Sequence, residues 1–236
     1  MNLKNSTSLI KLLNYSISLH KDEIDSLKTL CKRKKSNSAK WFELIYSILV
    51  GTQIKTERVK YCFDRIIEEY YDLLEPRFLH KLTDFTFLRE LINDSLKENG
   101  YRFHKTKSIA IYNCLLYFKK FNFNIDYFIK KFKNYKEIRQ ELINIKGIGL
   151  KIASHWLRNI GYIIPVVDIH IKNLFYRLKI VDNQKLSYLS YETIQNELSE
   201  SLKIDNITFD LALWLFGKNF CGNRKCKCCK INCRNI

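Results

Sequence analysis

The chain has only seven glycines and two prolines among its 236 residues, so few positions can interrupt a regular backbone. Apolar residues recur at intervals of three and four rather than in alternation, which is the period of a helix. Between residues 55 and 74, for example, one helix face collects the apolar side chains of Val59, Phe63, Ile66, Ile67 and Tyr70. We therefore predict an all-α protein, in which the 46% of hydrophobic residues form one or two sizeable cores.

The same pattern places the helix boundaries. We expect one or two helices at residues 8–30, followed by helices at residues 41–50, 55–74, 87–98, 106–118, 135–145 and 150–160. The basic run at residues 32–35 and the polar residues after it mark the first candidate domain boundary.

A net charge of +17, from 41 basic and 24 acidic residues, favours a nucleic-acid partner. Compositional drift is the alternative, because a chain rich in Ile, Asn and Tyr suggests AT-rich coding, which raises the lysine content without selection for binding. The longest uncharged apolar stretches, at residues 44–54 and 159–167, are shorter than the roughly 18 residues of a membrane-spanning helix. The first residues of the sequence show no signal-peptide pattern. We therefore expect a cytoplasmic, nucleoid-associated protein without a membrane partner.

Five of the eight cysteines lie close together near the C-terminus, at Cys221, Cys226, Cys228, Cys229 and Cys233. In a reducing cytosol such a group binds a metal or an iron–sulfur centre more readily than it forms disulfides. Four thiolates can surround one cubane cluster or one zinc ion. We expect core positions for the three cysteines in apolar helical contexts, Cys31, Cys62 and Cys114.

Two glycines one residue apart join two predicted helices at residues 145–151, in the sequence IKGIGLK. Glycine permits a tight turn and lets backbone N–H groups approach a phosphate closely. The helix that follows directs the positive end of its dipole to the same place. We therefore expect a helix–hairpin–helix whose contacts to the DNA backbone come from Lys146, Gly147, Ile148 and Gly149. An ordinary glycine-rich helix connection is the alternative.

Lys151 is the candidate nucleophile. It follows the hairpin in the first turn of a helix, opposite an apolar face formed by Ile152, Ala153, Trp156, Leu157 and Ile160. We expect its side of the helix to carry Ser154, His155 and Arg158 as well. The positive end of a helix dipole favours an uncharged, nucleophilic amine at this position. A solvated surface lysine is the alternative.

Asp168 is the second candidate, and with it a family resemblance emerges. It stands where an N-cap belongs, before the periodic run IHIKNLFYRL, and a cap alone is the alternative role. The segment INIKGIGLKIAS, followed by Asp168 in VVDIHI, resembles the catalytic core of the helix–hairpin–helix DNA glycosylase superfamily, of the endonuclease III kind. In that family the lysine at the position of Lys151 attacks the deoxyribose C1′ and forms a Schiff base, assisted by the aspartate that matches Asp168.

The resemblance implies a two-lobed fold and a cluster. One lobe would be a helical barrel over residues 38–163, and the other a discontinuous iron–sulfur domain formed by residues 1–37 and 164–236. The C-terminal cysteines resemble the family's [4Fe-4S] loop, and the best fit assigns the ligands Cys221, Cys226, Cys229 and Cys233. The four, two and three residues between them make a shorter loop than in endonuclease III and leave Cys228 spare. A zinc site is the alternative.

Residues that fill the gap left by a flipped-out base are also implied. Gln53, after the helix break at Gly51, matches the family's gap-filling glutamine. Tyr101 is placed like the second wedge residue, next to Arg102, which we also expect to contact DNA. A polar turn residue and a buried aromatic are the respective alternatives for Gln53 and Tyr101.

The activity implied is that of a bifunctional DNA glycosylase and AP lyase of base excision repair. As a monomer on double-stranded DNA with a damaged base or abasic site, it would excise an oxidised base through a Schiff base on Lys151. It would then cleave 3′ to the abasic site by β-elimination. A monofunctional adenine or mismatch glycosylase typically lacks this lysine, and a non-catalytic hairpin module would only bind DNA.

Two parts of the sequence favour different damaged bases. The cysteines and Gln53 favour oxidised pyrimidines such as thymine glycol. The hairpin and the segment ENGYRFHKTKS resemble archaeal-type 8-oxoguanine glycosylases, which use their extreme C-terminus to recognise the purine. Because cysteines occupy that end here, we expect oxidised pyrimidines, with an 8-oxoguanine-specific enzyme as the alternative.

Overall fold

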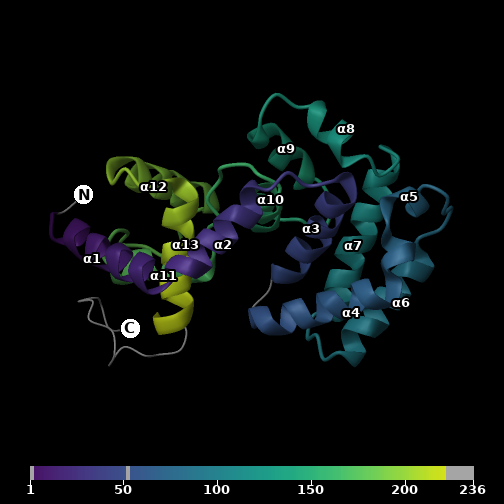
Figure 1. Ribbon diagram of the computed structural model, residues 1–236, viewed down its shortest axis with the longest axis horizontal. Coiled ribbons are helices and arrows are strands. Elements are labelled where there is room, and N and C mark those ends of the chain that lie inside the picture. The colour runs from purple at the N-terminus through teal and green to yellow at the C-terminus, as the bar shows by residue number, and fades with distance from the viewer. Residues whose placement is uncertain (1–2, 52–53, 222–236) are drawn as a thin grey trace. The chain divides into compact units, whose positions relative to one another are not determined.

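The computed structural model describes residues 3–51 and 54–221, and every regular element in these ranges is helical (Figure 1). The predicted all-α class is confirmed. The chain divides into two compact units, one formed by Met1–Arg33 with Ile163–Ile236 and the other by Lys34–Tyr162. No helix in the described ranges combines the length and the apolar character needed to cross a membrane.

The unit Lys34–Tyr162 is built around α3, which packs against α4, α7, α8 and α10. Its core is aromatic: the Trp41 ring meets Phe118 and Phe123 edge-on, with ring centroids 5.8 and 5.7 Å apart. The helices of this unit are α3 (Asn37–Val50), α4 (Thr56–Leu74), α5 (Pro76–Leu79), α6 (Thr86–Glu98), α7 (His104–Lys119), α8 (Ile125–Lys130), α9 (Tyr135–Leu142) and α10 (Leu150–Asn159).

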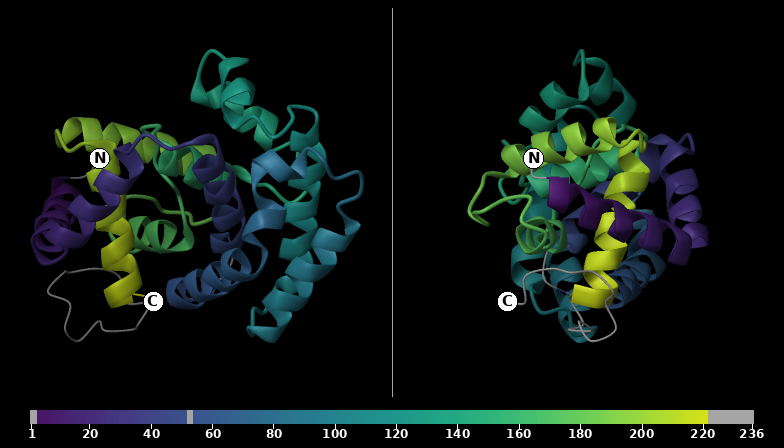
Figure 2. Two further views of the ribbon diagram at one scale, coloured as in Figure 1. Left: turned by 45° about the vertical axis from the view of Figure 1, so that its right-hand side comes forward. Right: turned by 90° about the vertical axis from the view of Figure 1, so that its left-hand side faces the viewer.

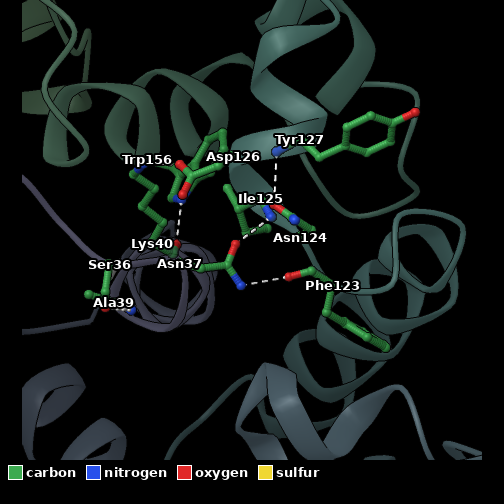
Figure 3. A network of polar contacts seen from close by, with 10 residues as sticks. All are labelled: Ser36, Asn37, Ala39, Lys40, Phe123, Asn124, Ile125, Asp126, Tyr127 and Trp156. Carbon is green, nitrogen blue, oxygen red and sulfur yellow. Dashed lines mark hydrogen bonds and ion pairs between the residues drawn. The ribbon is translucent and has the colours of Figure 1, made fainter.

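A polar network joins the start of α3 to the turn before α8 (Figure 3). The Asn37 side chain donates to the Phe123 carbonyl at 2.9 Å and accepts from the Ile125 N–H at 2.6 Å. Lys40 and Asp126 form an ion pair beside it. Phe123 has φ of 55°, a left-handed conformation that is rare for a bulky residue. The two bonds from Asn37 hold the backbone in that conformation, which carries the Phe123 ring into the core.

The other unit is arranged around α13, which contacts α1, α2, α11 and α12 (Figures 1 and 2). Eight of the eleven residues of α13 are buried, as expected for a helix that is apolar on nearly all sides. Ser16 donates to the Ala212 carbonyl at 2.7 Å and so ties α1 to α13. The helices of this unit are α1 (Leu3–Leu19), α2 (Lys21–Lys32), α11 (Ile169–Arg177), α12 (Tyr188–Ser201) and α13 (Asn206–Phe216), with a π-helical turn η1 (Gly217–Cys221).

Candidate functional site

The hairpin joins α9 to α10 and is locked against α7. Gly147 has φ of +102°, and a Cβ at this position would lie 2.6 Å from the Cβ of Ala110, so only glycine fits. Asn113 on α7 donates to the carbonyl of Lys146 at 2.8 Å. Gly149, in contrast, has an ordinary φ of −103°, and a Cβ there would meet nothing within 4 Å. Packing against α7 therefore requires glycine at position 147, whereas neither packing nor φ requires glycine at position 149.

The structure separates the four hairpin residues that we expected to contact DNA. Lys146, Gly147 and Gly149 are exposed. Ile148 is 4% exposed, and its N–H donates to the Ile145 carbonyl at 2.9 Å. The side chain of Ile148 is therefore buried and its N–H is already hydrogen-bonded. The exposed backbone of the turn belongs to Lys146, Gly147 and Gly149. The N-cap of α10 is Gly149, so within the described ranges no cap side chain accepts a hydrogen bond from the first amides of this helix.

Lys151 lies in the first turn of α10 and is half-buried. Among the described residues its amine has no hydrogen-bond or ion-pair partner. The helix below it is firmly held, because the Trp156 ring is completely buried and its Nε1 donates to the Lys40 carbonyl at 2.8 Å (Figure 3). The candidate nucleophile thus projects from a fixed support.

The prediction that Ser154 and Arg158 lie on a polar, solvent-facing side of α10 is wrong. Ser154 is fully buried and accepts a hydrogen bond from Arg139 Nη1 at 3.2 Å, and Arg158 is 9% exposed. The reason is that α10 packs against α3 on one side and α9 on another, so solvent reaches little of its surface. His155 lies with Nδ1 2.9 Å from Ser47 Oγ. Burial, and then the charges of Arg158 and Lys151, hold the pKa of His155 well below its usual value, so the ring is neutral at pH 7.

Lys107, on α7, is a site residue that we did not predict. Its side chain is 5% exposed, and a Cβ on Gly51 would lie 3.1 Å from its Nζ. Burial, and then the charge of Lys151, lower the pKa of Lys107 to about 8. The sequence did contain a signal, because Lys107 precedes Ile111 and Cys114 on the buried face of the helix.

Asp168 belongs to the other unit and caps α11. Its Oδ1 accepts from the N–H groups of His170 and Ile171 at 2.9 and 3.1 Å. The side chain is 7% exposed, and Oδ2 has no hydrogen-bond partner within the described ranges. The cap role is therefore present, and one carboxylate oxygen remains available.

The extended segment before Asp168 is fixed by its own amides. The Val166 N–H donates to Asp210 Oδ1 at 3.0 Å, and the Val167 N–H donates to the Tyr188 hydroxyl at 3.2 Å. Asp210 is 1% exposed and also accepts from Gln195 Nε2 at 2.7 Å. These contacts hold the segment that ends at Asp168.

The structure does not support Tyr101 as a wedge. Its ring is 1% exposed, and its hydroxyl donates to the Leu49 carbonyl. A ring packed in the core and bonded to α3 cannot enter a DNA duplex, so Tyr101 fits the alternative of a buried aromatic. Arg102, the next residue, is exposed, with its guanidinium 5.1 Å from the centre of the Phe103 ring. Gln53 lies outside the described residues.

Of the predicted cluster ligands, only Cys221 lies in the described ranges, at the end of η1 and packed against the core of its unit. Cys226, Cys229 and Cys233, together with Cys228, lie outside them. Within the described ranges no group of three or more His, Cys, Asp or Glu residues is placed to hold a metal ion. The core positions predicted for Cys31, Cys62 and Cys114 are confirmed, because all three are buried.

Comparison with known proteins agrees with this architecture. The crystal structure of the Methanocaldococcus jannaschii 8-oxoguanine glycosylase/lyase in complex with 15mer DNA containing 8-oxoguanine matches with a TM-score of 0.70 and 30% identity, over 90% of this chain and 98% of that one. An endonuclease III–DNA covalent complex matches with a TM-score of 0.66 at 17% identity, over 97% and 95% of the two chains, which shows a shared fold. The fold is thus that of the helix–hairpin–helix DNA glycosylases.

The family follows from the sequence match. Residues 21–204 match the family model described as 8-oxoguanine DNA glycosylase, and the chain belongs to this family. The M. jannaschii 8-oxoguanine DNA glycosylase/AP lyase is 32% identical over 136 residues, which are 55% of this chain and 63% of that protein. The matched stretch is therefore less than two thirds of the length of this relative.

Proposed function

We propose that this protein is an 8-oxoguanine DNA glycosylase with AP lyase activity, which acts on damaged double-stranded DNA in base excision repair. The observation that carries the proposal is Lys151, a half-buried amine that directly follows the hairpin and has no partner in the described ranges. Family membership and the names of the relatives support the same activity.

The proposed chemistry uses two side chains. The uncharged amine of Lys151 attacks C1′ of a flipped-out nucleotide, the Nζ–C1′ bond forms, and the bond from C1′ to the base breaks with its electrons leaving on the base. Oδ2 of Asp168 is available to stabilise the positive charge that develops on the sugar, because Oδ1 is already engaged in capping α11. Loss of a proton from Nζ and cleavage of the C1′–O4′ bond, with a proton going to O4′, then open the sugar ring and give the Schiff base. The Schiff base loses a proton from C2′ and then the 3′-phosphate in a β-elimination.

Binding would depend on the DNA backbone. The exposed turn at Gly147 and Gly149, the uncapped N-terminus of α10 and the exposed Lys146 suit a phosphate and carry no base-specific group. We expect one monomer to bind each lesion.

The choice of substrate differs from our first expectation. The cysteines and Gln53 led us to favour oxidised pyrimidines, but all of these residues except Cys221 lie outside the described ranges. The relatives, in contrast, are named 8-oxoguanine DNA glycosylase/AP lyase. The alternative substrate, 8-oxoguanine, therefore has the better support.

A single-turnover panel tests this proposal. Four matched duplexes would each contain one lesion: 8-oxoguanine paired with cytosine, thymine glycol, 5-hydroxycytosine, or a preformed abasic site. Borohydride would be present to reduce any Schiff base. We expect fastest release of 8-oxoguanine and a covalent adduct that Lys151→Gln abolishes while duplex binding persists. Release of oxidised pyrimidines alone would restore the first expectation. A wild-type protein that binds every duplex but releases no base and forms no adduct would be a non-catalytic module.

We propose further that Cys221, Cys226, Cys229 and Cys233 hold a [4Fe-4S] cluster. Cys221 suits this role because it is anchored by the core of its unit at the start of the cysteine-rich segment. When bound, the cluster would serve as a structural crosslink that organises a basic segment containing Arg224, Lys225, Lys227 and Lys230.

Anaerobic purification tests the cluster. We expect brown protein with about four irons per chain and the broad absorption of such clusters. Cys228→Ser should retain the iron, whereas Cys229→Ser should lose it. Colourless protein with stoichiometric zinc would contradict the proposal, and the reverse pattern in the two variants would change the ligand set.

A further inference from the structure

Lys107 occupies a position where a lysine is costly. It lies in the first turn of α7, is 5% exposed, and shares its helix face with buried Ile111, Cys114 and Leu115. Lysines are almost never fully buried unless they are paired. Within the described ranges Lys107 has no hydrogen-bond or ion-pair partner that would compensate for its burial.

The charged group that acts on Lys107 is a second lysine. α7 packs against α3 and α6, and it contacts the turn before α10 through Ala110 and Gly147. Of the charged and titratable groups on these elements, the one whose field acts on Lys107 is Lys151. Lys151 likewise lacks an ion-pair or hydrogen-bond partner among the described residues. The charge of Lys151 therefore acts on Lys107, and among the described residues no carboxylate is paired to either amine.

The meeting point of the two elements is Gly51. A Cβ at this position would lie 2.8 Å from Ile152 Cγ1 and 3.1 Å from Lys107 Nζ. The amine of Lys107 and the side chain of Ile152, the residue next to Lys151, thus border the same side of Gly51. A larger residue at position 51 would displace one of them.

We propose that Lys107 is a positioning residue that acts through Lys151, by accepting the proton that Lys151 must lose before it can attack C1′. This inference rests on the proposed lyase activity. In the transfer, an N–H bond of the Lys151 ammonium breaks, an N–H bond forms on the uncharged Lys107 amine, and the positive charge moves from one lysine to the other. No further reactant is needed. Amines that repel each other's charge favour a state in which only one is protonated.

The electrostatics of Lys107 agree with this role. Its pKa of about 8, lowered first by burial and then by Lys151, leaves part of the population uncharged near neutral pH. A lysine with the ordinary pKa of 10.5 would stay protonated and could not accept a proton. General bases work best when their pKa lies near the operating pH.

The test is borohydride trapping by the full chain on a duplex with a preformed abasic site, which removes base recognition from the measurement. Single-turnover rates would be followed from about pH 6.5 to 9.5. We expect the wild-type rate to rise with a midpoint near 8. Lys107→Met should remove this midpoint and slow trapping about tenfold at the plateau. Lys107→Arg should do the same, because a guanidinium keeps the charge and cannot deprotonate. Lys105→Met, at an exposed position in the same turn, should match the wild type.

The outcomes separate the two proposals. A wild-type protein that is not trapped at any pH would overturn the proposed activity. Wild-type trapping with an unchanged midpoint in both Lys107 variants would overturn the role of Lys107 alone. A measurement on the wild type guards against misfolded variants: NMR titration of labelled lysine amines should place Lys107 near 8, and Lys151→Met should raise that value. Titration of Lys107 near 10.5 would overturn the inference.

Discussion

At the scale of single residues, Lys107 links stability to pH. An ammonium that is buried without a carboxylate destabilises the folded chain relative to the unfolded one. Its pKa is about 8 in the folded protein and 10.5 in an ordinary lysine, so the unfolded chain binds the proton more tightly. Above pH 10.5 the lysine is uncharged in both states and burying it carries no such penalty. The free energy of unfolding then decreases as the pH falls from 10.5, and the decrease is complete once the pH is below about 8.

Lys107→Met should accordingly stabilise the protein at pH 7. We expect the free energy of unfolding to rise by on the order of 2–3 kcal/mol, with the gain shrinking toward zero as the pH approaches 10.5. Urea unfolding at pH 7 and 10 measures this, with Lys105→Met as the exposed control. A variant less stable than the wild type at pH 7 would show that Lys107 has a stabilising partner.

Asp168 divides two tasks between its two oxygens, so substitutions should separate them. Asp168→Asn keeps a capping oxygen, and we expect it to cost less than about 0.5 kcal/mol of stability while slowing base excision by orders of magnitude. Asp168→Ala removes the cap as well and should cost about 1 kcal/mol. Thermal unfolding and single-turnover excision measure the two effects. Excision at the wild-type rate by Asp168→Asn would leave Asp168 with the cap alone.

At the scale of elements, the hairpin depends on α7 as much as on its own glycines. Ala110 and Asn113 of α7 hold the turn from outside, through a close contact with Gly147 and a hydrogen bond to the Lys146 carbonyl. The next glycine, Gly149, has no neighbour at the place of a Cβ. Gly147 therefore allows the turn to pack against α7, whereas Gly149 leaves open space beside the turn.

A matched pair of alanine substitutions should show this difference. Gly147→Ala forces an alanine into a positive φ and places its Cβ only 2.6 Å from the Cβ of Ala110, so we expect a loss of about 2–4 kcal/mol in the free energy of unfolding. Gly149→Ala should change stability by less than about 0.5 kcal/mol but weaken duplex binding, because the new methyl group occupies space left for a phosphate. Chemical unfolding and fluorescence anisotropy provide the measurements. Unaltered duplex binding by Gly149→Ala would exclude the turn from the DNA contact.

At the scale of the whole molecule, the charge of +17 makes binding depend on salt. We expect the logarithm of the duplex binding constant to fall linearly with the logarithm of the salt concentration, for damaged and undamaged DNA alike. Lys146→Met, which removes an exposed cation from the hairpin, should reduce this slope by about 1. Affinity that does not change with salt would favour compositional drift as the origin of the lysines.

Features that depend on neighbours in the sequence were predictable. The scarcity of glycine and proline and the three-to-four periodicity act within one helix, so they predicted the all-α class and most helix positions. Asp168 was recognised as a cap because a cap involves only the next three residues. The hairpin was recognised from its two glycines, of which Gly147 has the positive φ that the turn requires.

Burial was decided by tertiary structure, because it depends on elements that are distant in sequence. Ser154 and Arg158 looked solvent-facing on their own helix, yet α3 and α9 enclose them. Tyr101 resembled a wedge, but the Leu49 carbonyl of α3 binds its hydroxyl in the core. Lys107 looked like one lysine among many in a basic segment. Only the packing of α7, Gly51 and α10 removes its amine from water and exposes it to the charge of Lys151, and that change of surroundings gives it a distinct chemistry.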